Sequence, residues 1–177
     1  MTPRAERTGM LVVYTGDGKG KTTAALGAAW RALGRGMKVT VVQFIKGKWK
    51  TGERMLAEKL EGLDFHVMGR GFTWESDDLE KDRQAAQAAW NTAKQALQPG
   101  ACDLLILDEL TYTVTYGFLD LEEILTALAA RPAGMHVIVT GRGAPGKLVT
   151  QADLVTEMKP VKHPFERGIS AQPGLDF

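Results

Sequence analysis

The stretch TGDGKGKTT, residues 15–23, has the residue types of a loop that binds the phosphate groups of a nucleotide. Its glycines let the backbone turn so that successive N–H groups point at phosphate oxygens, and a helix beginning near Lys21 adds its positive dipole end. Lys21 would pair with phosphate charge, and the Thr22 hydroxyl would bind Mg²⁺. A glycine-rich turn that binds nothing is the alternative, but strand, glycines, Gly-Lys-Thr and helix occur in register. The predicted nucleotide-binding residues are Thr15, Gly16, Asp17, Gly18, Lys19, Gly20, Lys21, Thr22 and Thr23.

The loop departs from the usual phosphate-loop pattern at its first position. That pattern has a glycine five residues before the Gly of the Gly-Lys pair, where this chain has Thr15. Threonine cannot adopt a positive φ without cost, whereas glycine can. We therefore expect the chain to turn one residue later, at Gly16.

The run LLILDE, residues 104–109, supplies a second half of a nucleotide site. An apolar strand that ends in Asp108 and Glu109 would place two carboxylates at the carboxyl edge of the sheet, beside the loop. One of them would hold Mg²⁺ directly or through water, and the residues leave open which one. The pattern is common by itself, but after a phosphate loop it predicts a nucleotide site with Mg²⁺.

The residues alone do not settle the reaction, because phosphate loops serve ATPases, kinases, GTPases and other transferases. The guanine-specific motif N-K-x-D is absent, so we expect ATP rather than GTP. Arg142, in the turn TGRG, is either another phosphate contact or an ordinary loop arginine.

The elements that must position these residues alternate between strand and helix. Such alternation predicts an α/β fold: a doubly wound, mostly parallel sheet flanked by helices, in the P-loop NTPase (RecA-like) architecture. Asp77 and Glu80 resemble a capping box that starts one helix. Apolar runs indicate strands near 10–15, 39–45, 65–68, 104–109, 136–141 and 153–159, and helices are expected near 21–36, 52–62, 78–97 and 121–132.

Composition indicates one globular domain over residues 1–177, with a short flexible stretch at 1–9 and a tail at 160–177 that could cover a ligand. No apolar run is long enough to span a membrane, and no secretory signal is apparent. A single cysteine agrees with a reducing compartment, so we expect a cytoplasmic protein. Lys and Arg number 22 against 21 Asp and Glu, a net charge of +1 that gives no basic footprint for nucleic acid.

Six segments taken in order resemble the ATP:corrinoid adenosyltransferase family of cobalamin biosynthesis and salvage. They are VYTGDGKGKTTAALG, VVQFIKGKWKTGER, GRGFTWESDD, LLILDELTY, VIVTGRGAP and PVKHPFERGISAQPGLDF. The resemblance runs from about residue 10 to the last residue. A phosphate loop alone would not single out this family, whereas six segments in this order, including the unusual FTWE and KHPFERG, do.

The resemblance implies that a corrinoid reduced to Co(I) attacks the ribose 5′-carbon of ATP and expels triphosphate. Lys21 would act catalytically by neutralising the departing triphosphate, which such members are thought to bind in reverse order along the loop. A turn shifted to Gly16 would suit that placement. Phe72 and Trp74 would displace the lower axial ligand of cobalt, and His163 would lie near the ligand. In the second segment, Gln43, Lys46 and Glu53 would face nucleotide or corrin. The resemblance also implies a homodimer and an electron donor such as a reduced flavoprotein.

Two departures from the family pattern affect these expectations. Asp17 stands where many members carry asparagine, and it would either accept from a ribose hydroxyl or weaken ATP binding. Longer members carry an amino-terminal helical extension over the corrinoid site, whereas about nine residues precede the first strand here. Two other functions remain in view: a phosphate-loop ATPase or small-molecule kinase that releases ADP, and a nucleotide-binding regulatory module without turnover.

Overall fold

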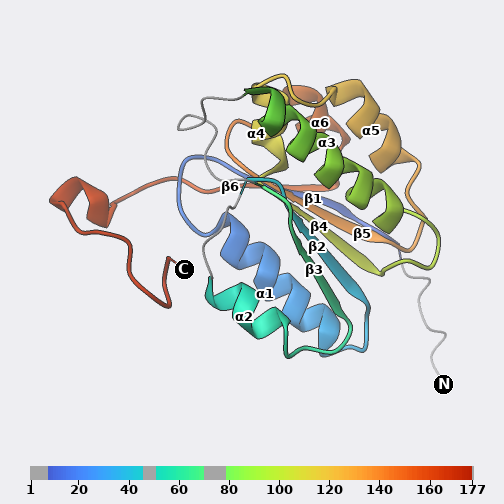
Figure 1. Ribbon diagram of the computed structural model, residues 1–177, viewed down its shortest axis with the longest axis horizontal. Coiled ribbons are helices and arrows are strands. Elements are labelled where there is room, and N and C mark those ends of the chain that lie inside the picture. Colours follow the sequence, from blue (N-terminus) through green and yellow to red (C-terminus); the bar gives the residue numbers. More distant parts are fainter. Residues whose placement is uncertain (1–7, 46–50, 70–78, 177) are drawn as a thin grey trace.

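A six-stranded sheet with helices on both faces forms the body of the protein in a computed structural model that describes residues 8–45, 51–69 and 79–176 (Figure 1). Every pair of neighbouring strands is parallel, and the strand order is β3-β2-β4-β5-β1-β6. The predicted doubly wound α/β fold is confirmed. The strands are β1 (Leu11–Thr15), β2 (Val39–Gln43), β3 (Leu63–Val67), β4 (Leu104–Asp108), β5 (His136–Thr140) and β6 (Leu154–Glu157).

Helices cover the sheet unequally. Two pack on one face, α1 (Lys21–Leu33) and α2 (Gly52–Ala57), as Figure 1 shows. The other face carries α3 (Leu79–Ala96), α4 (Leu110–Thr115), α5 (Leu121–Ala129) and α6 (Gly146–Gln151). A short 3-10 helix, η2 (Pro164–Arg167), lies in the carboxyl-terminal tail, which extends away from the sheet.

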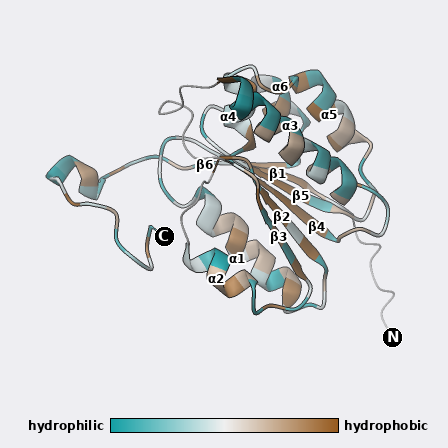
Figure 2. Ribbon diagram, in the orientation of Figure 1, coloured by the Kyte–Doolittle hydropathy of each residue, from teal (hydrophilic) through white to brown (hydrophobic). Residues whose placement is uncertain are grey.

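The central strands are apolar on both faces because both are covered, and they form the brown centre of Figure 2. Alternate residues enter two separate cores. Leu105, Leu107 and Val139 pack with Trp90 of α3 in the larger core, while Ile106 and the alanines of α1 belong to the smaller one. The strand β6 differs, since its four residues are exposed at the sheet edge.

The predicted strands and helices are confirmed, with ends shifted by a few residues. Helices α4 and α6 and the 3-10 helix were not predicted. The sequence of α4, LTYTVT, is rich in β-branched residues that favour strands. It forms a helix because the chain must turn back from the buried end of β4, and burial of Leu110, Thr111 and Thr113 stabilises that turn. Asp77 of the expected capping box lies outside the described residues.

The strand order places β5 between β1 and β4. All strands are parallel, so the end of β1, which leads into the phosphate loop, lies at the same edge as the ends of β4 and β5. Three segments far apart in the sequence therefore meet there: residues 15–21, 108–110 and 140–144. In open α/β sheets this carboxyl edge is where ligands bind.

Asp120 is the N-cap of helix α5, and its carboxylate accepts from the N–H groups of Glu122 (2.6 Å) and Glu123 (3.4 Å). We predict that Asp120→Ala lowers the free energy of unfolding by about 1 kcal/mol, because two backbone donors of the first turn lose their acceptor. Asp120→Asn, which keeps an N-cap acceptor, should stay within a few tenths of a kcal/mol of the parent. Urea denaturation measures both, and equal losses in the two variants would contradict this capping role.

Candidate active site

The phosphate loop turns where the sequence analysis placed the turn. Gly16 has φ +92°, a conformation that L side chains rarely adopt, so the shifted turn is confirmed. A Cβ atom on Gly16 would also lie 2.4 Å from the carbonyl oxygen of Met158. The segment that leaves β6 therefore braces the loop, and Gly18 N–H donates to the same carbonyl oxygen at 2.7 Å.

Lys21 occupies the centre of this loop and is only 6% exposed. Its ammonium donates to the carbonyl oxygens of Gly16 (2.7 Å) and Gly18 (2.6 Å). Burial lowers the pKa of Lys21, and nearby Arg142 lowers it further, whereas the carboxylate of Glu109 raises it. The loop thus holds a desolvated cation that an anion in the cavity would stabilise.

A buried carboxylate joins the loop to two neighbouring strands. Asp108, at the end of β4, is 1% exposed. Its Oδ1 accepts from the hydroxyls of Thr22 (2.8 Å) and Thr140 (2.7 Å), and its Oδ2 accepts from the Gln43 amide (2.9 Å). Both carboxylate oxygens of Asp108 therefore have hydrogen-bond donors, and the group lies directly behind Thr22.

Glu109 is placed differently from its neighbour. Among the described residues it alone combines a side chain with a positive φ, at +63°. Its backbone N–H donates to the Thr140 hydroxyl at 3.0 Å, so Thr140 accepts from Glu109 while it donates to Asp108. This left-handed turn directs the Glu109 side chain to the cavity that the loop lines.

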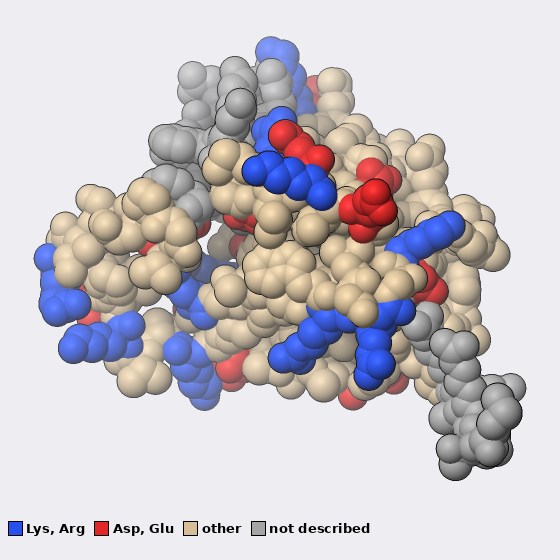
Figure 3. Space-filling model, turned by 90° about the horizontal axis from the view of Figure 1, so that it is seen from below, with Lys and Arg blue, Asp and Glu red and all other residues tan. Residues whose placement is uncertain are grey.

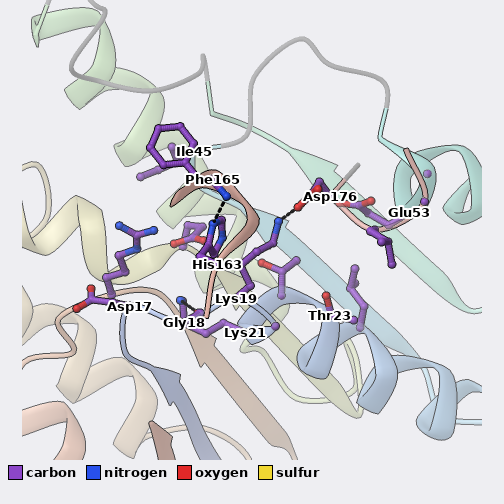
Figure 4. A pocket seen from close by; sticks show the side chains of 18 of the residues that line it. Asp17, Gly18, Lys19, Lys21, Thr23, Ile45, Glu53, His163, Phe165 and Asp176 are labelled. Carbon is purple, nitrogen blue, oxygen red and sulfur yellow. Dashed lines mark hydrogen bonds and ion pairs between the residues drawn. The ribbon is translucent and has the colours of Figure 1, made fainter. Parts of the chain in front are cut away.

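That cavity has a volume of about 910 Å³, near the upper end for small-molecule sites. Figure 4 shows it between the phosphate loop and the carboxyl-terminal tail. Its polar floor and apolar rim suit a ligand that is charged at one end. The lining residues are Asp17, Gly18, Lys19, Gly20, Lys21, Thr22, Thr23, Leu26, Trp30, Ile45, Gly52, Glu53, Leu56, Glu109, Tyr112, Arg142, His163, Phe165, Gly174, Leu175 and Asp176.

Most of the predicted site residues meet in this cavity. Loop residues 17–23, Glu109, Arg142 and His163 line it, whereas Thr15, Gly16 and Asp108 do not. Glu53 also lines it, while Gln43 is buried against Asp108. Phe72, Trp74 and Lys46 lie outside the described residues.

Several lining residues were missed by the sequence analysis. Trp30 and Leu56 are apolar yet exposed, Trp30 by 50%, and they form the rim beside α1 and α2. Tyr112 enters from the unpredicted helix α4, and burial together with the Glu109 carboxylate raises the pKa of its phenol. Tyr112 belongs to the segment LLILDELTY, which resembles the family, but the sequence analysis assigned it no role.

The carboxyl-terminal tail closes one side of the cavity. Asp176 forms an ion pair with Lys19 of the phosphate loop, as Figure 4 shows. His163 Nδ1 accepts from the N–H of Phe165 at 3.2 Å, which starts η2 at the cavity wall. In Figure 3 the tail lies to the left of a hollow, and the face over α1 and α2 carries basic and acidic side chains interspersed.

The cavity chemistry fits a nucleotide with its divalent ion. Thr22 and Glu109 bring hydroxyl and carboxylate oxygens, the ligand type that Mg²⁺ prefers, next to the phosphate loop. No group of three or more His, Cys, Asp or Glu side chains that could hold a metal occurs within residues 8–45, 51–69 and 79–176. Nucleotide-bound Mg²⁺ needs only one or two protein carboxylates.

Within residues 8–45, 51–69 and 79–176, no helix is long and apolar enough to cross a membrane.

Comparison with known proteins agrees with this chemistry. Residues 7–177 match the family described as ATP:corrinoid adenosyltransferase BtuR/CobO/CobP. The corrinoid adenosyltransferase CobA of Salmonella typhimurium is 51% identical over 172 residues, which are 97% of this chain and 87% of that protein. The corrinoid adenosyltransferase of Pseudomonas aeruginosa is 50% identical over 175 residues, covering 98% of this chain and 86% of the relative.

A solved structure supports the fold alone. The flagellar accessory protein FlaH from Methanocaldococcus jannaschii superposes with a TM-score of 0.53 at 13% identity, covering 85% of this chain and 71% of FlaH. Sequence similarity decides the family. The resemblance found in the sequence is thereby confirmed, and this chain belongs to the ATP:corrinoid adenosyltransferase family.

Proposed function

We propose that this cavity carries out the family reaction, the adenosylation of a corrinoid with ATP, by binding the triphosphate as a leaving group. In that reaction a bond forms between Co(I) of the substrate and the ribose 5′-carbon. The bond between that carbon and the triphosphate oxygen breaks, and its electron pair leaves with triphosphate. The observation that supports this assignment is the Lys21 ammonium, buried at the centre of a glycine loop that faces a large cavity.

Charge grows on the triphosphate as the bond to carbon breaks. Lys21 and the loop N–H groups would stabilise that charge more strongly in the transition state than in the bound substrate, which is the requirement for catalysis. Arg142, which lines the same cavity from the loop after β5, would add a guanidinium to the same chain of phosphates. The nucleophile is the cobalt of the substrate, so the protein needs no general base.

We assign different roles to the two carboxylates of β4. Glu109 lines the cavity and would hold Mg²⁺ together with Thr22. Asp108 is already satisfied by three donors behind Thr22, so it would orient the Thr22 hydroxyl. The ion would neutralise part of the triphosphate charge when bound.

The apolar rim and the tail would serve the larger substrate. A corrin ring is a broad apolar surface with polar substituents. Trp30, Leu56 and Phe165 offer apolar area in the same cavity as the phosphate loop. The tail at 160–177 would cover the ligand as the sequence analysis expected, with His163 near it. Phe72 and Trp74 keep their proposed role in displacing the lower axial ligand of cobalt.

Four further predictions stand beside the reaction. The chain would act as a homodimer and as one domain over residues 1–177. An electron donor such as a reduced flavoprotein would supply Co(I), because the substrate must be reduced before it attacks carbon. The cytoplasm, which supplies ATP and reductant, is the predicted location. Complete cobalamin and an incomplete precursor are both open as the corrinoid.

The products of turnover distinguish this reaction from a phosphate-loop ATPase or kinase. We predict that MgATP and a chemically reduced corrinoid, kept anaerobic and in the dark, give loss of the Co(I) spectrum with one triphosphate per adenosylated corrinoid. Omission of the corrinoid should abolish product formation. Formation of ADP, or triphosphate without change in the cobalt spectrum, would rule out the proposed use of the loop.

The two carboxylates should respond differently to removal of charge. Glu109→Gln should weaken the Mg²⁺-dependent part of ATP binding by at least about 10-fold, with little change in the melting temperature. Asp108→Asn replaces a carboxylate oxygen with an amide donor, although Thr22, Gln43 and Thr140 all donate to this group. This variant should therefore also lower the free energy of unfolding, by about 1–3 kcal/mol. Calorimetry of ATP binding with and without Mg²⁺, together with denaturation curves, measures both effects. Normal stability of Asp108→Asn combined with loss of Mg²⁺ dependence would instead make Asp108 the direct ligand.

The ion pair between Asp176 and Lys19 competes with phosphate for the lysine. We predict that Asp176→Asn tightens ATP binding by about 3-fold at low ionic strength, and that this gain shrinks in high salt. Glu166→Gln, which removes the same charge from an exposed position in η2, is the matched control and should leave ATP affinity unchanged. Weaker binding by Asp176→Asn would mean that this carboxylate contacts the nucleotide itself.

A further inference from the structure

Thr15 uses its side chain in a way that a glycine at this position could not. It ends β1, where the usual phosphate-loop pattern has glycine, and it does not line the cavity. Its Oγ1 accepts a hydrogen bond from the backbone N–H of Ala144 at 3.1 Å. This bond connects two loops that lie 129 residues apart in the sequence. The second of these loops, residues 141–144, follows β5 and carries Arg142.

The 141–144 loop is fixed at two further points around Arg142. The carbonyl oxygen of Arg142 itself accepts from the Thr111 hydroxyl at 2.7 Å. The N–H of Gly141 donates to the carbonyl oxygen of Tyr14 at 3.2 Å. Glycine is required here, since a Cβ atom on residue 141 would lie 2.0 Å from Thr111 Oγ1. The backbone before, at and after Arg142 is thus tied to β1 and α4.

The side chain held in this way is free to reach the ligand. Arg142 is exposed and lines the cavity together with Lys19 and Lys21. A guanidinium recognises phosphate by paired hydrogen bonds in a fixed plane, so its benefit depends on orientation more than that of an ammonium does. A long side chain on an unfixed loop would lose much of that benefit to conformational entropy.

We propose that Thr15, together with Thr111, is a positioning residue that aims Arg142 at the phosphate chain of the nucleotide. The threonine that replaces the usual glycine thereby helps to hold a third cation, Arg142, at the phosphate site from the loop that follows β5. This inference rests on the proposed function in one respect, the contact between Arg142 and phosphate. It does not depend on which atom of ATP reacts.

A double-mutant cycle tests the inference without turnover. The probes are MgATP and inorganic tripolyphosphate with Mg²⁺, and the readout is the dissociation constant from calorimetry. Thr15→Val, which keeps the shape and removes the acceptor, should weaken binding of both probes by about 3- to 10-fold. Thr15→Ser should retain parental affinity, and Thr15→Gly should behave like Thr15→Val. Arg142→Gln should weaken binding by at least about 10-fold.

The coupling between Thr15 and Arg142 in ligand binding distinguishes a positioning role from a merely structural one. If Thr15 acts through Arg142, adding Thr15→Val to the Arg142→Gln variant should leave the dissociation constant almost unchanged. A merely structural role for Thr15 would weaken binding by the same factor in both backgrounds, and that result overturns the inference. Full affinity of Arg142→Gln would also overturn it, by removing the phosphate contact. The triphosphate assay of the same variant would then show separately whether adenosyl transfer persists.

Discussion

A buried positive charge is the constraint on which this site depends. Lys21 must keep its ammonium away from water, and its own loop supplies two carbonyl oxygens as partners. Those carbonyls can face inward only because the chain reverses at Gly16, where a side chain would strike the segment after β6. Carbonyl dipoles do not neutralise a full charge, so the loop is poised for an anion. The rest of the site adds to that preference.

The parallel sheet explains why so few residues are needed to position the two carboxylates of the site. With β5 between β1 and β4, the single hydroxyl of Thr140 bridges the Asp108 carboxylate and the backbone of Glu109. One carboxylate, Asp108, is thereby buried behind Thr22, while its neighbour Glu109 lines the cavity. The arrangement brings Lys21, Arg142 and the Glu109 carboxylate together where the phosphate loop lines the cavity. The opposite rim is apolar and suits a substrate that brings its own nucleophile.

The sequence predicted those parts of the molecule that local patterns encode. Apolar strands, the phosphate loop and the acidic end of β4 follow from periodicity and spacing, and the turn at Gly16 follows from the steric cost of threonine. The strand order does not follow from spacing, so neither Thr140 nor Thr111 could be connected with the loop. Helix α4 was missed because tertiary burial outweighs the strand preference of Thr, Tyr and Val. The cavity positions of Asp176 and Tyr112 also depend on tertiary structure, since the resemblance covered their segments without assigning either residue a role.

The reaction itself came from resemblance rather than from geometry, because a phosphate loop can serve either end of a triphosphate. What geometry adds is a physical reason for the shared motif. A loop that stabilises negative charge serves phosphoryl transfer when the γ-phosphate reacts, and it serves alkyl transfer when the whole triphosphate departs. The difference lies in which atom of ATP faces the open part of the cavity.

The most direct test is therefore a crystal structure with MgATP bound in the absence of reduced corrinoid. This account predicts that Lys21 Nζ exchanges the Gly16 and Gly18 carbonyls for phosphate oxygens, with the phosphates in reverse order along the loop. The ribose 5′-carbon should face the apolar rim beside Trp30. A nucleotide bound in the usual order, with its 5′-carbon turned away from that rim, would contradict it.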